Sequence, residues 1–109
     1  MHTYDPGASI YTIDPTRTDL AAEFKANIRG PHSEELRRVL HRMRTTPLAG
    51  RYCVIVKEPF KEWIVGRLSG KRGEPPEIFE DRVFTSLDDV EWEVFRLRWL
   101  QLTGKALKP

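Results

Sequence analysis

The sequence has little of what a disulfide, a metal site or a membrane anchor requires. Its 109 residues include one cysteine and three histidines. Cys53 cannot form an internal disulfide and lies in an apolar run, so we expect a small, buried hydrophobic side chain. No apolar run approaches the roughly 18 residues of a membrane span, and the N-terminus lacks the basic-then-apolar order of a signal peptide. We therefore expect a cytoplasmic protein.

Patterns that carry catalysis are missing as well. His2, His32 and His41 are not spaced as metal ligands with one another or with Cys53. The glycines around Lys71 fit neither a Walker loop nor a dinucleotide-binding fingerprint. We therefore predict no catalytic, cofactor-binding or metal-binding residue in this chain. The residues indicate an interaction module or accessory subunit.

Charge and length limit the choices further. Charged residues make up 31% of the chain but the formal net charge is only +2, so the surface is well solvated without being strongly polarised. A chain of this length supports one domain. Residues 1–15 contain Pro6, Gly7 and Pro15 and show no sustained period, so we predict an N-terminal arm. Residues 16–109 are predicted to form a single domain.

Two helices are predicted after the arm. Leu20, Phe24 and Ile28 are spaced by four residues within the segment 18–28, and the Gly-Pro pair at 30–31 ends it. Ser33 is suited to cap a second helix. The buried face of that helix is predicted to be Leu36, Val39, Leu40 and Met43, and the rest of its surface is rich in arginine.

A β-hairpin is predicted next. Residues 51–57 and 62–68 are rich in β-branched and aromatic side chains and are separated by a four-residue connection. Both faces of this hairpin carry apolar side chains, which is typical of a sheet covered on both sides. A turn-rich loop, 69–77, leads to a short third strand at 82–84.

The last predicted helix, 86–103, has two apolar faces instead of one. Leu87, Val90, Val94 and Leu97 lie along one side of a helical wheel, and Trp92, Phe95, Trp99 and Leu102 lie roughly opposite. A surface helix of a small monomer needs only one such stripe. The second layer must come from elsewhere in the chain or from a partner, and we predict a partner interface at Trp92, Phe95, Trp99 and Leu102.

The expected fold is therefore α+β. It has two N-terminal helices, a three-stranded antiparallel sheet made of a hairpin plus a short strand, and a long C-terminal helix held against one face of the sheet. The N-terminal helices are expected to pack beside that helix.

The order of the residues resembles a known family, the small (alpha) subunit of N,N-dimethylformamidase. The likeness runs from about Pro31 to Leu107. The residues that carry it, in chain order, are Leu36, Arg38, Val39, His41, Pro47, Gly50, Arg51, Tyr52, Glu62, Trp63, Arg67, Gly73, Glu74, Pro76, Glu77, Arg82, Phe84, Phe95 and Arg98.

The resemblance implies a hetero-oligomeric amidohydrolase that converts N,N-dimethylformamide to formate and dimethylamine. In that family an iron ion in the large subunit is held by tyrosines and a carboxylate of that subunit and acts as a Lewis acid. None of those ligands corresponds to a residue of this chain. The resemblance therefore implies a non-catalytic small subunit whose partner, the large subunit, carries the iron.

Two alternatives stay open at this point. The first is nucleic-acid binding, in which strands enter a DNA groove. The basic residues available for it are Arg51, Lys57, Lys61, Arg67, Lys71 and Arg72. The modest net charge and the second aromatic face argue against this function. The second alternative is a self-associating module that buries the Trp99 stripe against its own copy.

Overall fold

The computed structural model describes residues 12–45 and 50–107. Two helices, α2 (Thr18–Ala26) and α3 (Glu34–Arg44), come before three strands, β1 (Tyr52–Glu58), β2 (Glu62–Arg67) and β3 (Glu77–Phe84). The chain then forms the long helix α4 (Leu87–Thr103). This order confirms the α+β fold expected from the sequence. None of the helices in the part of the chain described is long and apolar enough to cross a membrane.

The helix boundaries follow from the local sequence. Ser33 caps α3, with its Oγ accepting a hydrogen bond from the Leu36 amide at 3.3 Å. Ser86 caps α4 in the same way through the Asp89 amide. Gly104 ends α4 in the left-handed conformation, with φ 75°, which glycine adopts without steric cost.

The sheet is antiparallel in the order β1-β2-β3, so β1 and β3 are its edges. β3 is longer than the strand predicted at 82–84, because it already begins at Glu77 and pairs there with Arg67. Phe79 contacts Tyr52 on the side of the sheet that faces α4, at 6.3 Å between ring centroids. This contact holds the start of β3 in the sheet, and a register shift between Trp63 and Val65 of β2 absorbs the extra residues before Phe84.

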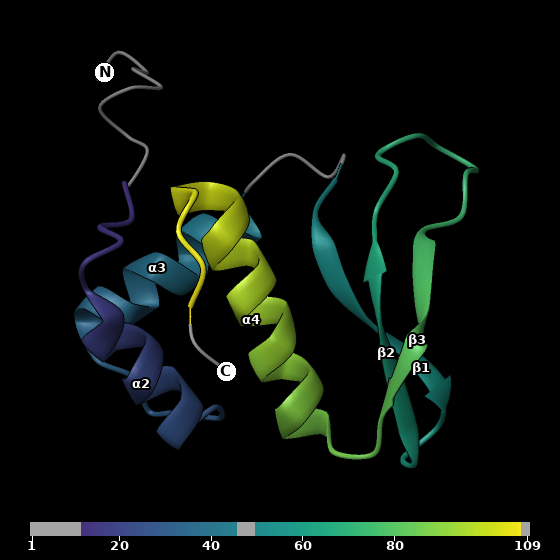
Figure 1. Cartoon of the computed structure of the whole chain (residues 1–109), viewed down its shortest axis with the longest axis horizontal. Coiled ribbons are helices and arrows are strands. Elements are labelled where there is room, and N and C mark those ends of the chain that lie inside the picture. Colours follow the sequence, from purple (N-terminus) through teal and green to yellow (C-terminus); the bar gives the residue numbers. More distant parts are fainter. Residues whose placement is uncertain (1–11, 46–49, 108–109) are drawn as a thin grey trace, which may run out of the picture.

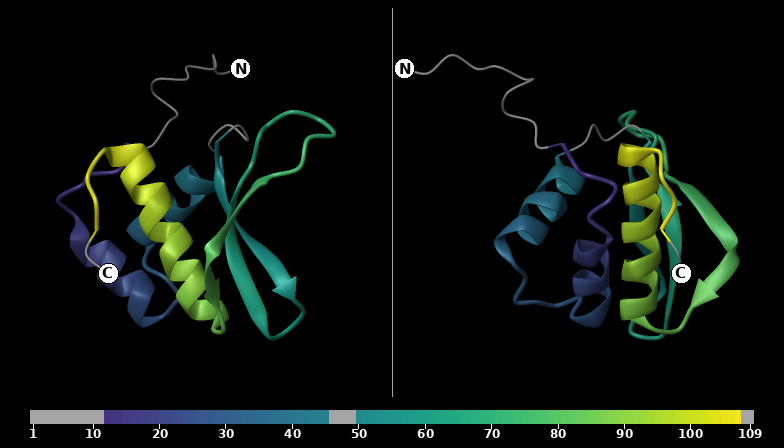
Figure 2. Two further views of the ribbon diagram at one scale, coloured as in Figure 1. Left: turned by 45° about the vertical axis from the view of Figure 1, so that its right-hand side comes forward. Right: turned by 60° about the vertical axis from the view of Figure 1, so that its left-hand side comes forward.

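The molecule has three layers, with α4 in the middle (Figures 1 and 2). One side of α4 packs on the sheet. There Val90 and Val94 of α4 form a core cluster with Val65 of β2 and Phe84 of β3. The other side packs on α2 and α3 and forms a second cluster. The N-terminal helices thus lie across α4 from the sheet.

The second cluster also contains Ile13, which is only 6% exposed. The packed core therefore includes a residue from the C-terminal part of the segment predicted as an arm. The aromatic and apolar residues earlier in that arm, Tyr4, Ile10 and Tyr11, lie outside the described residues, as does Pro47. The boundary between residues 15 and 16 stays a prediction.

Candidate interaction site

The aromatic stripe predicted as a partner interface lies largely inside the chain. Trp99 is completely buried and Phe95 is 2% exposed, while Trp92 and Leu102 are half-buried. The Phe95 ring stacks on Phe24 of α2, with ring centroids 4.4 Å apart and planes inclined by 14°. The second layer against α4 thus comes from α2 and α3. The expectation of an exposed stripe is wrong at Phe95 and Trp99, and a partner would have to displace those helices to reach either side chain.

The signal for this packing was present in the sequence. The two N-terminal helices each have an apolar face that needs a surface to cover it. Leu20, Phe24, Leu36 and Val39 from those faces are all buried in the cluster with Trp99. Sequence periodicity identified every one of these faces, but it does not state which face packs on which.

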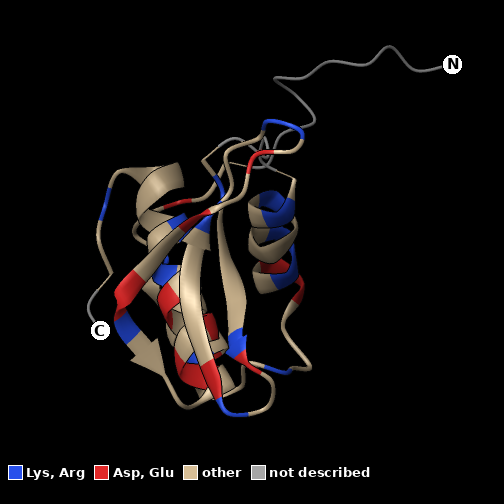
Figure 3. Cartoon of the chain, turned by 90° about the vertical axis from the view of Figure 1, so that its right-hand side faces the viewer, with Lys and Arg blue, Asp and Glu red and all other residues tan. Residues whose placement is uncertain are grey.

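No described helix covers the outer face of the sheet, which we define as the face turned away from α4 (Figure 2). All the described helices lie on the opposite face (Figure 2). Alternation along the strands places Cys53, Ile55, Ile64 and Ile78 on the outer face. Ile78 is 45% exposed, whereas Ile64 on the central strand is 3% exposed. Viewed toward the sheet, much of the strand length carries no charged residue (Figure 3).

Gly66 shows how tightly this outer face is packed. A Cβ atom at position 66 would lie 2.6 Å from Cγ1 of Ile55 and 3.3 Å from the Glu77 carbonyl oxygen. The Ile55 side chain therefore covers the backbone of the central strand.

Between the helical layer and the sheet is a cleft of about 330 Å³. We call it the β1–α3 cleft, because Val54 of β1 and Leu40, Met43 and Arg44 of α3 form two of its walls. The remaining lining residues are Phe24, Ile28, His32, Glu91, Val94, Phe95 and Arg98. The cleft combines apolar walls with guanidinium groups from α3 and α4, which is the usual composition of a site that binds an organic anion.

Arg98 is held against the sheet inside this cleft. Its Nε and Nη2 donate to the Tyr52 carbonyl oxygen at 3.0 and 2.8 Å. The Arg51 Nη1 donates to the Arg44 carbonyl oxygen at 2.6 Å, which brings a third guanidinium to the same region. Burial lowers the pKa of Arg98, and the charges of Arg51 and Arg44 lower it further.

The basic residues considered for nucleic-acid binding do not form one surface. Arg67 lies over the Tyr52 ring on the side of the sheet that faces α4, at 5.5 Å from the centroid. Arg51 is turned toward α3, and Lys61 pairs with Glu58 at the hairpin turn. Lys71 and Arg72 lie in the loop between β2 and β3. This distribution does not provide the continuous basic stripe that phosphate recognition needs.

Side chains that commonly bind metal ions do not cluster in the described part of the chain. Within residues 12–45 and 50–107, no three His, Cys, Asp or Glu side chains are placed to hold a metal ion. Burial raises the pKa of the Cys53 thiol, which keeps it protonated and poorly nucleophilic at neutral pH. The His32 Nε2 lies 2.8 Å from the Asn27 carbonyl oxygen.

Comparison with known proteins gives one finding. The family model described as "N,N-dimethylformamidase alpha subunit" matches residues 11–108. The match begins about 20 residues before the resemblance seen at Pro31, so it also includes α2. None of the curated proteins matches the chain.

Proposed function

Because the chain belongs to the N,N-dimethylformamidase alpha subunit family, we propose that it is the small, non-catalytic subunit of a hetero-oligomeric amide hydrolase. The reaction is the hydrolysis of N,N-dimethylformamide to formate and dimethylamine, and it takes place in the large subunit. The family match over residues 11–108 is the observation that carries this proposal.

The arrangement of the described side chains supports the division of labour between the subunits. Amide hydrolysis needs a nucleophile, which a bound metal ion or a positioned general base can activate. The described residues of this chain do not provide a fitting set of metal ligands. We therefore place the iron in the large subunit, together with the residues that bind the amide. The small subunit contributes folded surface to the assembly.

Reconstitution tests this proposal. The chain and the large subunit from the same source are purified separately and together, and each preparation is assayed for formate release and for iron. We expect the isolated chain to contain no stoichiometric iron or zinc and to release no formate. The co-purified complex is expected to contain iron and to hydrolyse the amide.

Two results would contradict the proposal. Stoichiometric metal in the isolated chain would mean that this subunit holds a metal site of its own. Failure of the chain to form a complex with the large subunit would remove its assignment as a subunit. A control with heat-denatured chain shows whether any gain in activity requires the folded small subunit.

A further inference from the structure

Arg98 differs in its surroundings from the described arginines that pair with carboxylates. Ion pairs with carboxylates are made by Arg17, Arg29, Arg38, Arg82 and Arg96. Arg98 is half-buried, yet within the described residues no carboxylate oxygen lies within 4.0 Å of its guanidinium. A charge that has lost part of its hydration is normally paired, because an uncompensated one destabilises the fold.

The described residues also leave part of the hydrogen-bonding capacity of Arg98 unused. A guanidinium has five N–H donors in a planar fork. Two of them are directed at the Tyr52 carbonyl oxygen. The other three have no acceptor among the described side chains and backbone groups. Arg98 therefore combines a fixed position on the β1 edge with N–H donors that no described group accepts from.

The other charged groups in the cleft favour an anion over a cation. Arg44 lines the same cleft and makes no ion pair with any described carboxylate. Glu91 is the one acidic residue of the lining, but its carboxylate is not within ion-pair distance of either guanidinium. His32 lines the cleft as well. The lining residues other than these four are apolar and can contact the aliphatic stem of a side chain.

We infer that the β1–α3 cleft receives an acidic side chain of the large subunit, whose carboxylate pairs with Arg98. This inference rests on the proposed function, because it takes the large subunit as the partner. The apolar walls at Leu40, Val54 and Val94 contact the stem of that side chain. Arg44 supplies a second positive charge.

A second copy of this chain fits the cleft less well. In a two-fold dimer the same patch of both copies meets. The cleft borders α3, whose exposed surface is rich in arginine (Figure 3). Pairing two such basic surfaces places like charges against each other, which opposes association.

The test measures dissociation of the co-expressed complex by mass photometry on dilution. Arg98→Gln removes the charge while it keeps a donor for the Tyr52 carbonyl. We expect the dissociation constant to rise roughly 30- to 1000-fold, as for truncation of one partner of a buried charge pair. Arg98→Lys is expected to lie between wild type and Arg98→Gln, because it keeps the charge but loses the fork.

Arg38→Gln is the matched control. This substitution also removes one positive charge, but from α3. Arg38 pairs with Glu34 and does not line the cleft. Its dissociation constant should stay within about 3-fold of wild type, as for a rim charge. If Arg38→Gln and Arg98→Gln raise the dissociation constant equally, general electrostatic attraction holds the complex together and the cleft has no specific role. This result would overturn the inference.

Glu91→Gln tests whether the carboxylate that pairs with Arg98 comes from the large subunit or is Glu91 itself. If the large subunit supplies the carboxylate, removing the negative charge of Glu91 should leave the complex as tight as wild type or tighter. If Glu91 is itself the counter-ion of Arg98, Glu91→Gln should lower the melting temperature of the free chain and Arg98→Gln should not weaken the complex. That second pattern overturns the inference.

Further outcomes are also decisive. If Arg98→Gln does not fold, Arg44→Gln takes its place, and we expect it to raise the dissociation constant of the complex about 3- to 10-fold. An unchanged dissociation constant for Arg44→Gln overturns the inference. Self-association of the free chain that Arg98→Gln abolishes would identify a second copy as the occupant and overturn it as well. If wild type fails to form the complex, the proposed function itself fails. If wild type forms the complex and Arg98→Gln forms it equally tightly, the inference about the cleft is wrong and the proposed function stands.

Discussion

At the scale of single residues, the side chains of α4 divide between two cores. Val90 and Val94 are buried against the sheet, while Phe95 and Trp99 are buried against α2 and α3. Phe24 extends the aromatic stack from α2, since its ring lies 4.4 Å from that of Phe95. The Phe95 and Trp99 rings follow at 5.9 Å. Trp99 is therefore part of the core of this chain.

Trp99→Ala is predicted to destabilise the isolated chain by about 3–5 kcal/mol, because it leaves a cavity in place of a large buried side chain. Domains of this size have a total stability of about 5–15 kcal/mol, so the loss should be obvious in urea unfolding. Leu100→Ala is the control, since Leu100 is the next residue of α4 and is 42% exposed. It should change stability by less than about 0.5 kcal/mol. If Trp99→Ala changes the free energy of unfolding only slightly, Trp99 is not a core residue, and its assignment to a partner interface would be favoured again.

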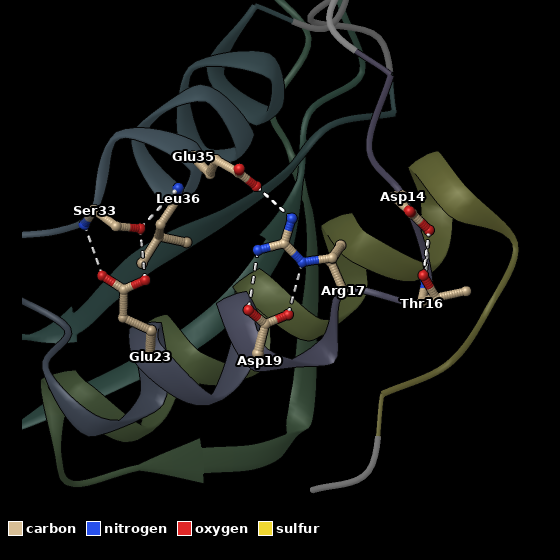
Figure 4. A network of polar contacts seen from close by, with 8 residues as sticks. All are labelled: Asp14, Thr16, Arg17, Asp19, Glu23, Ser33, Glu35 and Leu36. Atoms are coloured by element: carbon tan, nitrogen blue, oxygen red, sulfur yellow. Dashed lines mark hydrogen bonds and ion pairs between the residues drawn. The ribbon is translucent and has the colours of Figure 1, made fainter.

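At the scale of elements, a polar contact joins α2 to the start of α3 (Figure 4). The Glu23 carboxylate accepts hydrogen bonds from the Ser33 amide at 2.6 Å and the Ser33 hydroxyl at 2.7 Å. The same hydroxyl accepts from the Leu36 amide as the helix cap. Arg17 adds a second link, since it contacts both Asp19 of α2 and Glu35 of α3. These two links fix the orientation of α2 relative to α3.

The Glu23 contact predicts a pH dependence with a definite sign. Hydrogen bonds from Ser33 hold the pKa of Glu23 below its ordinary value of 4.5. The unfolded chain therefore binds this proton at a higher pH than the folded chain does. The stabilisation is complete above about pH 4.5 and is lost as the pH falls through the lower folded-state pKa.

Urea unfolding of wild type and Glu23→Gln across pH 3–7 measures this effect. The stability difference between the two proteins should be largest near neutral pH and should shrink below pH 4.5. Glu74→Gln is the control, because Glu74 lies in the β2–β3 loop and its side chain makes no hydrogen bond or ion pair with another described residue. A Glu23→Gln difference that is constant over the whole range contradicts the prediction.

At the scale of the whole molecule, α4 makes the two cores one structure. It contacts all three strands on one side and α3 on the other. Neither the sheet nor the α2–α3 pair can keep its apolar face covered once α4 leaves. We therefore predict that the isolated chain unfolds in a single cooperative transition.

A Trp63→Phe background tests this cooperativity, because the two remaining tryptophans, Trp92 and Trp99, both belong to the helical core. Tryptophan fluorescence then reports that core, while far-UV circular dichroism reports the whole chain. Val94→Ala, made on the sheet side, should destabilise the chain by about 1–3 kcal/mol and move both signals to the same lower urea midpoint. Two separate midpoints would mean that the layers unfold independently.

Much of this architecture was predictable from local patterns. The 3.6-residue period identified both stripes of α4, and the structure confirms each of them. Ser33 and Ser86 mark helix starts because a hydroxyl can satisfy a free amide at that position. The hairpin followed from two β-branched runs joined by a short connection. The start of β3 was missed, because Glu77 follows two prolines and a turn-rich loop and is held in place by contacts made across the sheet.

The sequence by itself determined which residues are apolar, how they are spaced along each element, and that α4 needs a layer on each side. Periodicity acts along one element, so it cannot specify which of two surfaces covers it. Tertiary structure decided that α2 and α3 cover Phe95 and Trp99, because their apolar faces are close enough in the folded chain to exclude water. It also decided that Arg98, 46 residues from Tyr52 in sequence, contacts the edge of β1 with donors left over. Charges and donors left without partners become visible only when distant segments are placed together in space.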